Sequence, residues 1–141
     1  MFFATLCTYD RYQWFQRYPE LTRQAMATLM DIGNNRGTLI YAWSFMPDHV
    51  HLLVQDDDLP QLVRAFKGRL TPSARVFEKD RRLWQASFFD HALRKEESVL
   101  AVAYYIWQNP VRVRLVEDYV DYPWSGSKVW PDWKSYYGTT K

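Results

Sequence analysis

Two histidines separated by one residue, His49 and His51, give the clearest indication of chemistry in this chain. They lie in the apolar stretch 41–54, which reads YAWSFMPDHVHLLV. Residues two apart on a β-strand point to the same face, so we expect the two imidazoles to lie side by side. Neighbouring imidazoles can chelate a divalent metal ion. The alternative is a pair of histidines held by hydrogen bonds on a half-buried strand.

A tyrosine and an asparagine with helical spacing form the second group. Tyr105 and Asn109 are four residues apart, which places them on one helix face, and Tyr104 and Gln108 form a parallel pair. A tyrosine can act as a covalent nucleophile, and its attack on a phosphodiester would give a phosphotyrosine link and a free hydroxyl. A bound metal ion would polarise that phosphate, and Asn109 could supply an oxygen ligand. The alternative is a tyrosine that only packs in the core.

The hydrophobic pattern predicts the elements that position these residues. Strands are expected at Phe2–Tyr9, Thr38–Phe45, His49–Gln55 and Leu83–Leu93, and helices at Pro19–Ile32, Leu59–Asp80 and Glu96–Gln108. Their order predicts a ferredoxin-like α+β fold, a split βαβ sandwich with an antiparallel sheet and an added helix that carries Tyr105.

Turn residues and prolines set the expected ends of these elements. The run 33–37, GNNRG, should end the first helix, and Asn109-Pro110 should close the last one. Ser98 is placed near the N-terminus of that last helix. Gly68 and Pro72 should bend or break the middle helix, because proline cannot continue the hydrogen-bond ladder without cost.

The size and composition predict one domain over residues 1–141, with an aromatic C-terminal tail from about residue 121 that includes Tyr136 and Tyr137. Apolar residues make up 48% of the chain, and the 18% that are aromatic suit core packing or the stacking of unpaired bases. Cys7 is the only cysteine, so a disulfide framework and a cysteine-based zinc site are excluded. The sequence lacks a signal peptide and a membrane-spanning apolar run, so we expect a cytoplasmic protein.

The charge is distributed unevenly. The formal net charge is only +2, but from Gln61 to Arg82 seven basic residues face only Glu78 and Asp80. This basic segment suits a phosphate backbone, although an ordinary solvated helix face has the same composition.

Four motifs together resemble a known family. They are Met46–Val54, Phe88–Arg94, Tyr105–Arg112 and Tyr122–Ser125, and they occur in the expected order. They are similar to motifs of the single-tyrosine HUH transposases, in which two histidines flank one hydrophobic residue, and most similar to those of the REP-associated tyrosine transposases.

The resemblance implies a site and an activity. His49, His51 and Asn109 fall on the family's metal ligands for Mg²⁺ or Mn²⁺, and Tyr105 falls on its nucleophile. The implied reaction is metal-dependent cleavage and joining of single-stranded DNA at hairpin-associated repeats, through a 5′-phosphotyrosine intermediate. His91 and Arg94 match family positions and are expected to line the site.

The expected partner is single-stranded or hairpin DNA, bound by a monomer or homodimer and without a membrane. We expect the DNA backbone to contact Lys67, Arg69 and Arg94. One departure from the family concerns Val113-Arg114, where a small residue and a glycine are usual. The turn after the last helix must therefore differ here or be strained.

Three other functions were compared. A histidine-triad nucleotide hydrolase needs a third histidine at position 53, which is leucine, and a two-histidine phosphoesterase needs a second His-x-Ser/Thr element, which is absent. A non-catalytic DNA-binding module, or a repressor derived from a transposase, stays open. Such a protein would have no chemical need for the histidine pair together with Tyr105.

Overall fold

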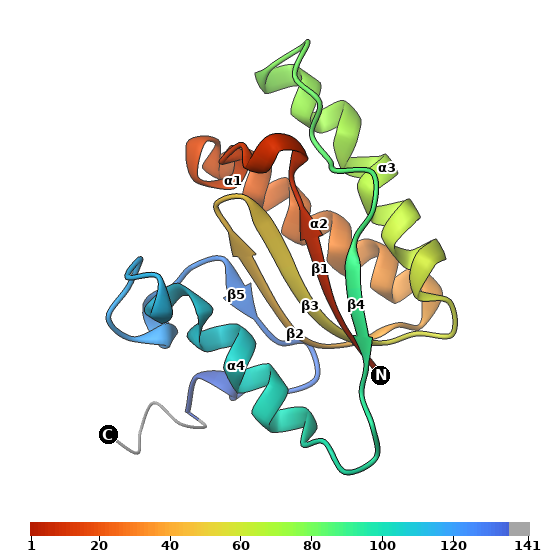
Figure 1. Ribbon diagram of the computed structural model, residues 1–141, viewed down its shortest axis with the longest axis vertical. Coiled ribbons are helices and arrows are strands. Elements are labelled where there is room, and N and C mark those ends of the chain that lie inside the picture. Colours follow the sequence, from red (N-terminus) through yellow and green to blue (C-terminus); the bar gives the residue numbers. More distant parts are fainter. Residues whose placement is uncertain (136–141) are drawn as a thin grey trace.

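One five-stranded antiparallel sheet with helices on both faces forms the protein (Figure 1). The computed structural model describes residues 1–135, so Tyr136 and Tyr137 lie outside the described residues. The strands are β1 (Phe2–Cys7), β2 (Leu39–Met46), β3 (His49–Gln55), β4 (Phe89–Ala92) and β5 (Ser125–Gly126). The helices are α1 (Trp14–Arg17), α2 (Pro19–Arg36), α3 (Leu59–Phe77) and α4 (Val99–Arg112). The predicted ferredoxin-like α+β fold is confirmed.

The sheet separates two hydrophobic clusters. Its strand order is β4-β1-β3-β2-β5, with α2 and α3 packed together on one side and α4 on the other. Val50, Leu52 and Val54 of β3 belong to the larger cluster with α2 and α3. Leu53, between them, belongs to the smaller cluster with Trp107 of α4. The alternation predicted for this strand is therefore confirmed, and the histidines point toward the α4 side.

The first long helix continues past its expected end at Ile32. It ends at Arg36, and Gly37 adopts the left-handed conformation (φ 71°) that caps helices. Gly33 lies inside the helix because it packs against β2, where a β-carbon would come within 2.8 Å of Ile40 Cδ1. The prediction mistook a close-approach glycine for a terminating one.

The middle helix is unbroken despite Gly68 and Pro72. It runs for 19 residues from Leu59 to Phe77. Proline removes only the N–H that would bind the Gly68 carbonyl, and both residues are exposed, so water can bind that carbonyl. Thr71 Oγ1 also donates to the Lys67 carbonyl at 2.8 Å and supports the neighbouring turn.

The last helix also continues through its proline. It begins after Ser98, whose hydroxyl accepts a hydrogen bond from Ala101 N, and it ends at Arg112 instead of at Asn109-Pro110. Arg114 follows with a left-handed φ of 63°, at the place where the family usually has glycine. The turn that the sequence questioned therefore forms with arginine, in a conformation that is costly for a residue with a β-carbon.

The fourth strand is shorter than the predicted Leu83–Leu93. Trp84 forms an isolated β-bridge with Thr8, and the Gln85 N–H donates to the Cys7 carbonyl. Regular pairing with β1, however, covers only residues 89–92. Between these two parts, Lys67 Nζ of α3 donates to the carbonyls of Gln85 and Ser87. This attachment to α3 interrupts the strand.

The C-terminal motif supplies the fifth strand. Tyr122 donates through its hydroxyl to the Phe45 carbonyl at 2.6 Å, and Ser125 Oγ donates to Ser44 Oγ at 2.8 Å. Gly126 then lies against the Trp43 ring, where a β-carbon would come within 2.4 Å of Cζ2. None of the helices in residues 1–135 is long and apolar enough to cross a membrane.

Gly126→Ala should lower the free energy of unfolding by about 1–3 kcal/mol, because the added methyl group collides with the partly buried indole of Trp43. Gly68→Ala is the matched control. A β-carbon at Gly68 meets nothing within 4 Å, so this variant should gain roughly 0.5–1 kcal/mol from helix propensity. Urea unfolding of the two variants measures both effects. Equal stability of the two variants would contradict the packing described at β5.

Candidate active site

The two histidines of β3 meet through their ring nitrogens on the α4 side of the sheet. Their Nε2 atoms are 3.1 Å apart, and the rings meet edge to face with centroids 4.6 Å apart. Both side chains are half-buried. The side-by-side arrangement expected from the sequence is therefore confirmed.

The opposite nitrogen of each ring has its own partner. His49 Nδ1 is 2.7 Å from Asp48 Oδ1, and His51 Nδ1 is 2.9 Å from the hydroxyl of Thr5 on the neighbouring strand β1. Thr5 lies directly opposite His51 in the register of the two strands. Partners of this kind fix the orientation of a metal-binding imidazole and leave Nε2 to face the site.

The local charges support this arrangement. Burial raises the pKa of Asp48, but the hydrogen bonds from His49 and Arg11 outweigh it and bring the pKa to about 2. An ionised carboxylate can only accept, so His49 Nδ1 carries the proton. Burial, followed by the charges of His49 and Arg112, lowers the pKa of His51 to about 3. His51 is therefore neutral at pH 7, as a metal ligand must be.

A strained turn brings Arg11 to Asp48. Asp10 and Arg11 both have left-handed φ angles, of 59° and 54°, which cost energy for residues other than glycine. Thr8 holds the turn by donating to the Tyr12 carbonyl, and Arg11 Nε reaches Asp48 Oδ2 at 3.0 Å. The aspartate that orients His49 is thus itself held by a cation.

Helix α4 brings Tyr105 and Asn109 to the same place. Asn109 Nδ2 lies 3.5 Å from His49 Nε2, and Tyr105 meets the ring of Phe3, which in turn contacts His51. Arg112 covers the Tyr105 ring at 3.9 Å and donates to the Tyr105 carbonyl and to Asn109 Oδ1. Tyr105 remains half-exposed, with 51% of its surface accessible.

The neighbouring Tyr104 lies in a different environment. Its hydroxyl accepts a hydrogen bond from Gln108 Nε2 at 2.8 Å, and its ring packs against buried Tyr119. It belongs to the border of the core cluster under α4. Tyr104 is therefore a packing residue. Tyr105 instead contacts Phe3, whose ring also contacts His51.

His91 lies next to Tyr105. Both line an open, mostly apolar hollow of about 440 Å³ together with Phe3 and Glu97. His91 Nε2 is 2.9 Å from the Glu97 carboxylate, and the residue pairs with Phe3 across β4 and β1. Arg94 follows in the exposed connection to α4, where its backbone N–H donates to Glu97.

Lys67 and Arg69 are not brought to the histidines. Both lie on α3, across the sheet from α4. Arg69 pairs with Asp31 of α2 at 2.6 Å. Burial lowers the pKa of Lys67, which donates to two backbone carbonyls. Their contact with DNA stays a prediction, and any such contact lies away from the histidine pair.

The donor set fits a divalent ion. In residues 1–135 no group of three or more His, Cys, Asp or Glu side chains forms a metal site, so the histidine pair needs another type of ligand. Asn109 would supply it after a turn of its carboxamide, which brings Oδ1 next to His49 in place of Nδ2 and gives up the hydrogen bond that Oδ1 accepts from Arg112. Two imidazoles and one amide oxygen suit Mn²⁺ better than Mg²⁺, which prefers oxygen ligands.

The fold is that of a transposase. A family model described as "Transposase IS200 like" matches residues 3–109, and the chain belongs to that family. The range includes both histidines, Tyr105 and Asn109.

Individual relatives confirm the resemblance to REP-associated tyrosine transposases. The Escherichia coli protein of that name is 28% identical over 101 residues, and a candidate member from Haemophilus influenzae is 33% identical over 94. These matches cover 69% and 57% of this chain, and 59% and 53% of the relatives. The chain thus spans little more than half the length of either relative.

Solved structures agree with the fold. The structure of a REP-associated tyrosine transposase bound to a REP hairpin matches with a TM-score of 0.71 and 26% identity, over 88% of this chain and 74% of that one. A transposase candidate from Deinococcus radiodurans matches with a TM-score of 0.55 and 23% identity, over 74% of this chain and 86% of that one. The second likeness shows the fold alone.

Sequence reasoning missed the residues that orient the histidines. Asp48 is adjacent to His49 and lies inside the motif Met46–Val54, but the sequence alone indicated no role of its own for it. Thr5 and Arg11 lie 46 and 38 residues away from their histidines along the chain, and only the strand register and the turn bring them close. No local pattern identifies them.

Thr5→Val should weaken the binding of Mn²⁺ by roughly 10–100-fold, because the hydroxyl that fixes the His51 ring is replaced by a methyl group of similar size. Thr71→Val removes a hydroxyl from α3 on the other side of the sheet and serves as the control. Isothermal titration with Mn²⁺ gives both affinities. Equal affinities in the two variants would show that Thr5 does not orient His51.

Proposed function

We propose that this chain cleaves and rejoins single-stranded DNA with the help of a divalent metal ion, through a covalent link to Tyr105. The family assignment supports a transposase, and the site supports this particular chemistry. The proposed substrate is a strand next to a hairpin repeat, since the similar solved structure is that of a protein bound to a REP hairpin.

One observation carries the proposal. His49 and His51 hold their Nε2 atoms 3.1 Å apart, while Asp48 and Thr5 occupy both Nδ1 atoms. Two ring nitrogens at this distance also suit one hydrogen bond, but the Asn109 carboxamide, 3.5 Å from His49 Nε2, adds the third donor group that an ion needs. A chain that only bound DNA would also not need this geometry beside a half-exposed tyrosine.

Each side chain has a part in the proposed reaction. His49, His51 and Asn109 would hold Mg²⁺ or Mn²⁺, which when bound polarises the scissile phosphate and neutralises charge. Tyr105 Oη attacks the phosphorus, the bond to the 3′ oxygen breaks, and the phenolic proton passes through solvent to that oxygen. The products are a 5′-phosphotyrosine and a free 3′-hydroxyl.

The reverse reaction joins strands. A 3′-hydroxyl attacks the phosphotyrosine and restores the phosphodiester, so no other energy source is needed. Arg112 keeps the Tyr105 ring in place by stacking on it and by binding the carbonyl of the same residue. The hollow beside Phe3 and His91 leaves the tyrosine open to a strand.

Tyr105→Phe should abolish the covalent adduct, because it removes only the nucleophilic hydroxyl. Tyr104→Phe is the matched control and should keep the adduct, since that hydroxyl binds Gln108. Denaturing gels with end-labelled hairpin oligonucleotides measure both variants. An adduct that vanishes only in Tyr104→Phe would move the nucleophile by one residue. No adduct from the unmodified protein on any hairpin substrate would favour a DNA-binding module or repressor.

Removal of the metal provides an independent prediction. Cleavage should stop in excess chelator and return with Mn²⁺ or Mg²⁺, because without the ion the neutral imidazole of His51 supplies no charge to neutralise the phosphate. Melting temperatures in chelator separate loss of the ion from loss of the fold. Equal cleavage rates with and without chelator would exclude a metal role for His49 and His51.

A further inference from the structure

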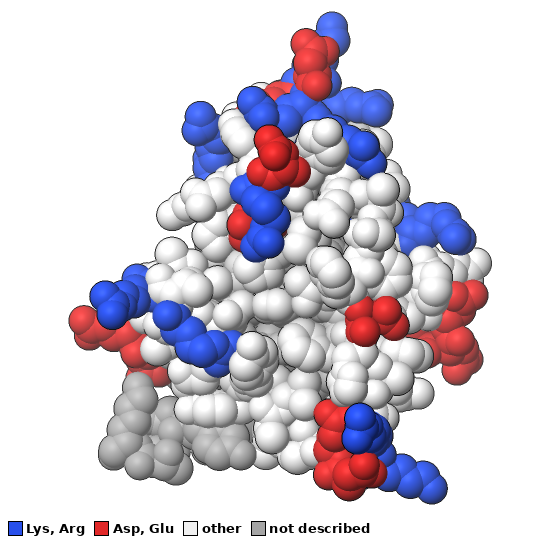
Figure 2. All heavy atoms as spheres, in the orientation of Figure 1, with Lys and Arg blue, Asp and Glu red and all other residues white. Residues whose placement is uncertain are grey.

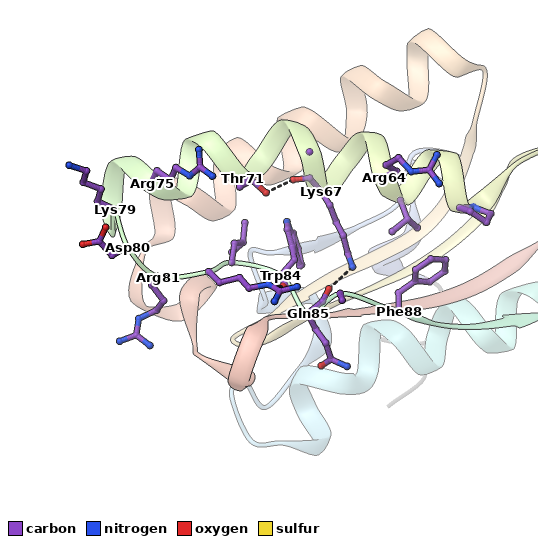
Figure 3. A pocket seen from close by; sticks show the side chains of 16 residues that line it. Arg64, Lys67, Thr71, Arg75, Lys79, Asp80, Arg81, Trp84, Gln85 and Phe88 are labelled. Atoms are coloured by element: carbon purple, nitrogen blue, oxygen red, sulfur yellow. Dashed lines mark hydrogen bonds between the residues drawn. The ribbon is translucent and has the colours of Figure 1, made fainter.

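A basic hollow lies on the side of the sheet away from the histidines. It has a volume of about 650 Å³ and separates α3 from the connection 79–88 that leads to β4 (Figure 3). Asp80 is the one acidic residue in its lining. The six cationic side chains that line it are Arg64, Lys67, Arg75, Lys79, Arg81 and Arg82. Lys and Arg also gather in Figure 2 around the far end of α3.

The cations of this hollow fall into two groups. Lys67 binds the carbonyls of Gln85 and Ser87, Arg81 pairs with Glu78, and Arg82 donates to the Trp84 carbonyl. Arg64, Arg75 and Lys79 form no ion pair with the described residues 1–135. These three charges are available to an anion from outside.

Helix geometry aligns two of the available cations. Arg64 and Arg75 are eleven residues apart, which is about three turns, so they leave the same side of α3 about 16 Å apart. Gly68 lies between them without a side chain, and a β-carbon there would meet nothing within 4 Å. Gly68 therefore adds no side chain to this part of the hollow, and cations flank it.

One side chain spans the hollow. Lys67 Nζ crosses it to the backbone of Gln85, and the rings of Trp84 and Phe88 lie within about 6 Å of that ammonium group. Arg64 and Arg75 extend from the helix above this floor (Figure 3). An extended single strand is a ligand that can follow cations placed in this way along one helix.

The same connection leads to the catalytic face. It continues into β4, where Phe89 pairs with Thr5, the residue that holds His51. Phe89 is 63% exposed at this outer edge of the sheet, on the same face as Thr5 and His51. A strand that leaves the hollow therefore reaches the region of Tyr105 by passing over β4.

We propose that this hollow binds several nucleotides of single-stranded DNA, next to the stretch that Tyr105 cleaves. Arg64, Arg75 and Lys79 bind its phosphates, as cationic grooves do in other single-strand binders. The inference rests on the proposed function in one respect, namely that the ligand is DNA. It adds a second contact region, which lengthens the recognised strand.

Gly68→Glu tests the groove because it places a negative charge between the cations without strain on the helix. Gly68→Gln has the same size without the charge, and Gln24→Glu adds the same charge on an exposed position of α2. Fluorescence anisotropy without metal measures the binding of a short oligonucleotide and of versions extended on the 5′ or the 3′ side. One extension should strengthen binding to the unmodified protein.

Gly68→Glu should bind the extended oligonucleotide roughly tenfold or more weakly than the unmodified protein does. The slope of its log affinity against log salt concentration should fall by about one, which corresponds to one fewer ion released. Gly68→Gln should lose less, and Gln24→Glu should behave as the unmodified protein. If neither extension strengthens binding, or if the three variants bind alike, the groove is not a DNA site. Displacement of the DNA by polyglutamate as readily as by unlabelled DNA would also overturn it.

The double variant Arg64→Gln/Arg75→Gln gives a second measurement that does not depend on Gly68. It should lose the same gain, and retained affinity for the extended strand would contradict the proposal. These results are independent of cleavage. The adduct on Tyr105 tests the proposed function, whereas the affinity differences among variants test the groove.

Discussion

The register in which β3 pairs with β1 is the constraint on which the site depends. It sets Thr5 opposite His51 and Cys7 opposite His49, while Val50, Leu52 and Val54 enter the core with α2 and α3. A slip of one residue would bury both imidazoles in that core and expose its apolar side chains. The free energy of core formation therefore also fixes the positions of the two histidines. Folding and site assembly are the same event on this strand.

The position of α4 explains why the site is open. The helix packs against β2 and β3, where Trp107 donates through its indole N–H to the Gly126 carbonyl. It leaves the edge strand β4 uncovered on that face, as Figure 1 shows, and it reaches β1 where Tyr105 meets Phe3. Tyr105 lies at the boundary, half-exposed, with its backbone fixed in a helix. A nucleophile there combines a rigid support with access for a long substrate.

The parts of this arrangement with a short-range pattern were predictable from the sequence. The period of two in β3 placed the histidines on one face, and the spacing of four in α4 placed Tyr105 with Asn109. Helix ends were less predictable, because Gly33 and Pro110 stop a helix only when packing allows it. Pro110 is buried within α4, and Gly33 lies against Ile40.

Contacts between distant segments could not be predicted in this way. Arg11 reaches Asp48 only through two left-handed residues, and nothing in their sequence requires that conformation. The connection 79–88 follows α3 because Lys67 binds its carbonyls, so the predicted fourth strand was too long. Lys67 and Arg69 are separated from the histidines because α3 packs on the side of the sheet opposite α4. Charge in a sequence identifies a basic segment, but the side of the sheet that it occupies is decided by tertiary structure.

The central claim is that the facing Nε2 atoms of His49 and His51 hold one divalent ion. Pulsed electron paramagnetic resonance of the Mn²⁺-bound protein tests it directly, because nitrogen couplings report imidazoles that are bonded to the ion. The account predicts couplings from two imidazoles in the unmodified protein and from one in either His49→Ala or His51→Ala. A bound Mn²⁺ with only oxygen ligands, or a spectrum unchanged by both substitutions, would contradict it.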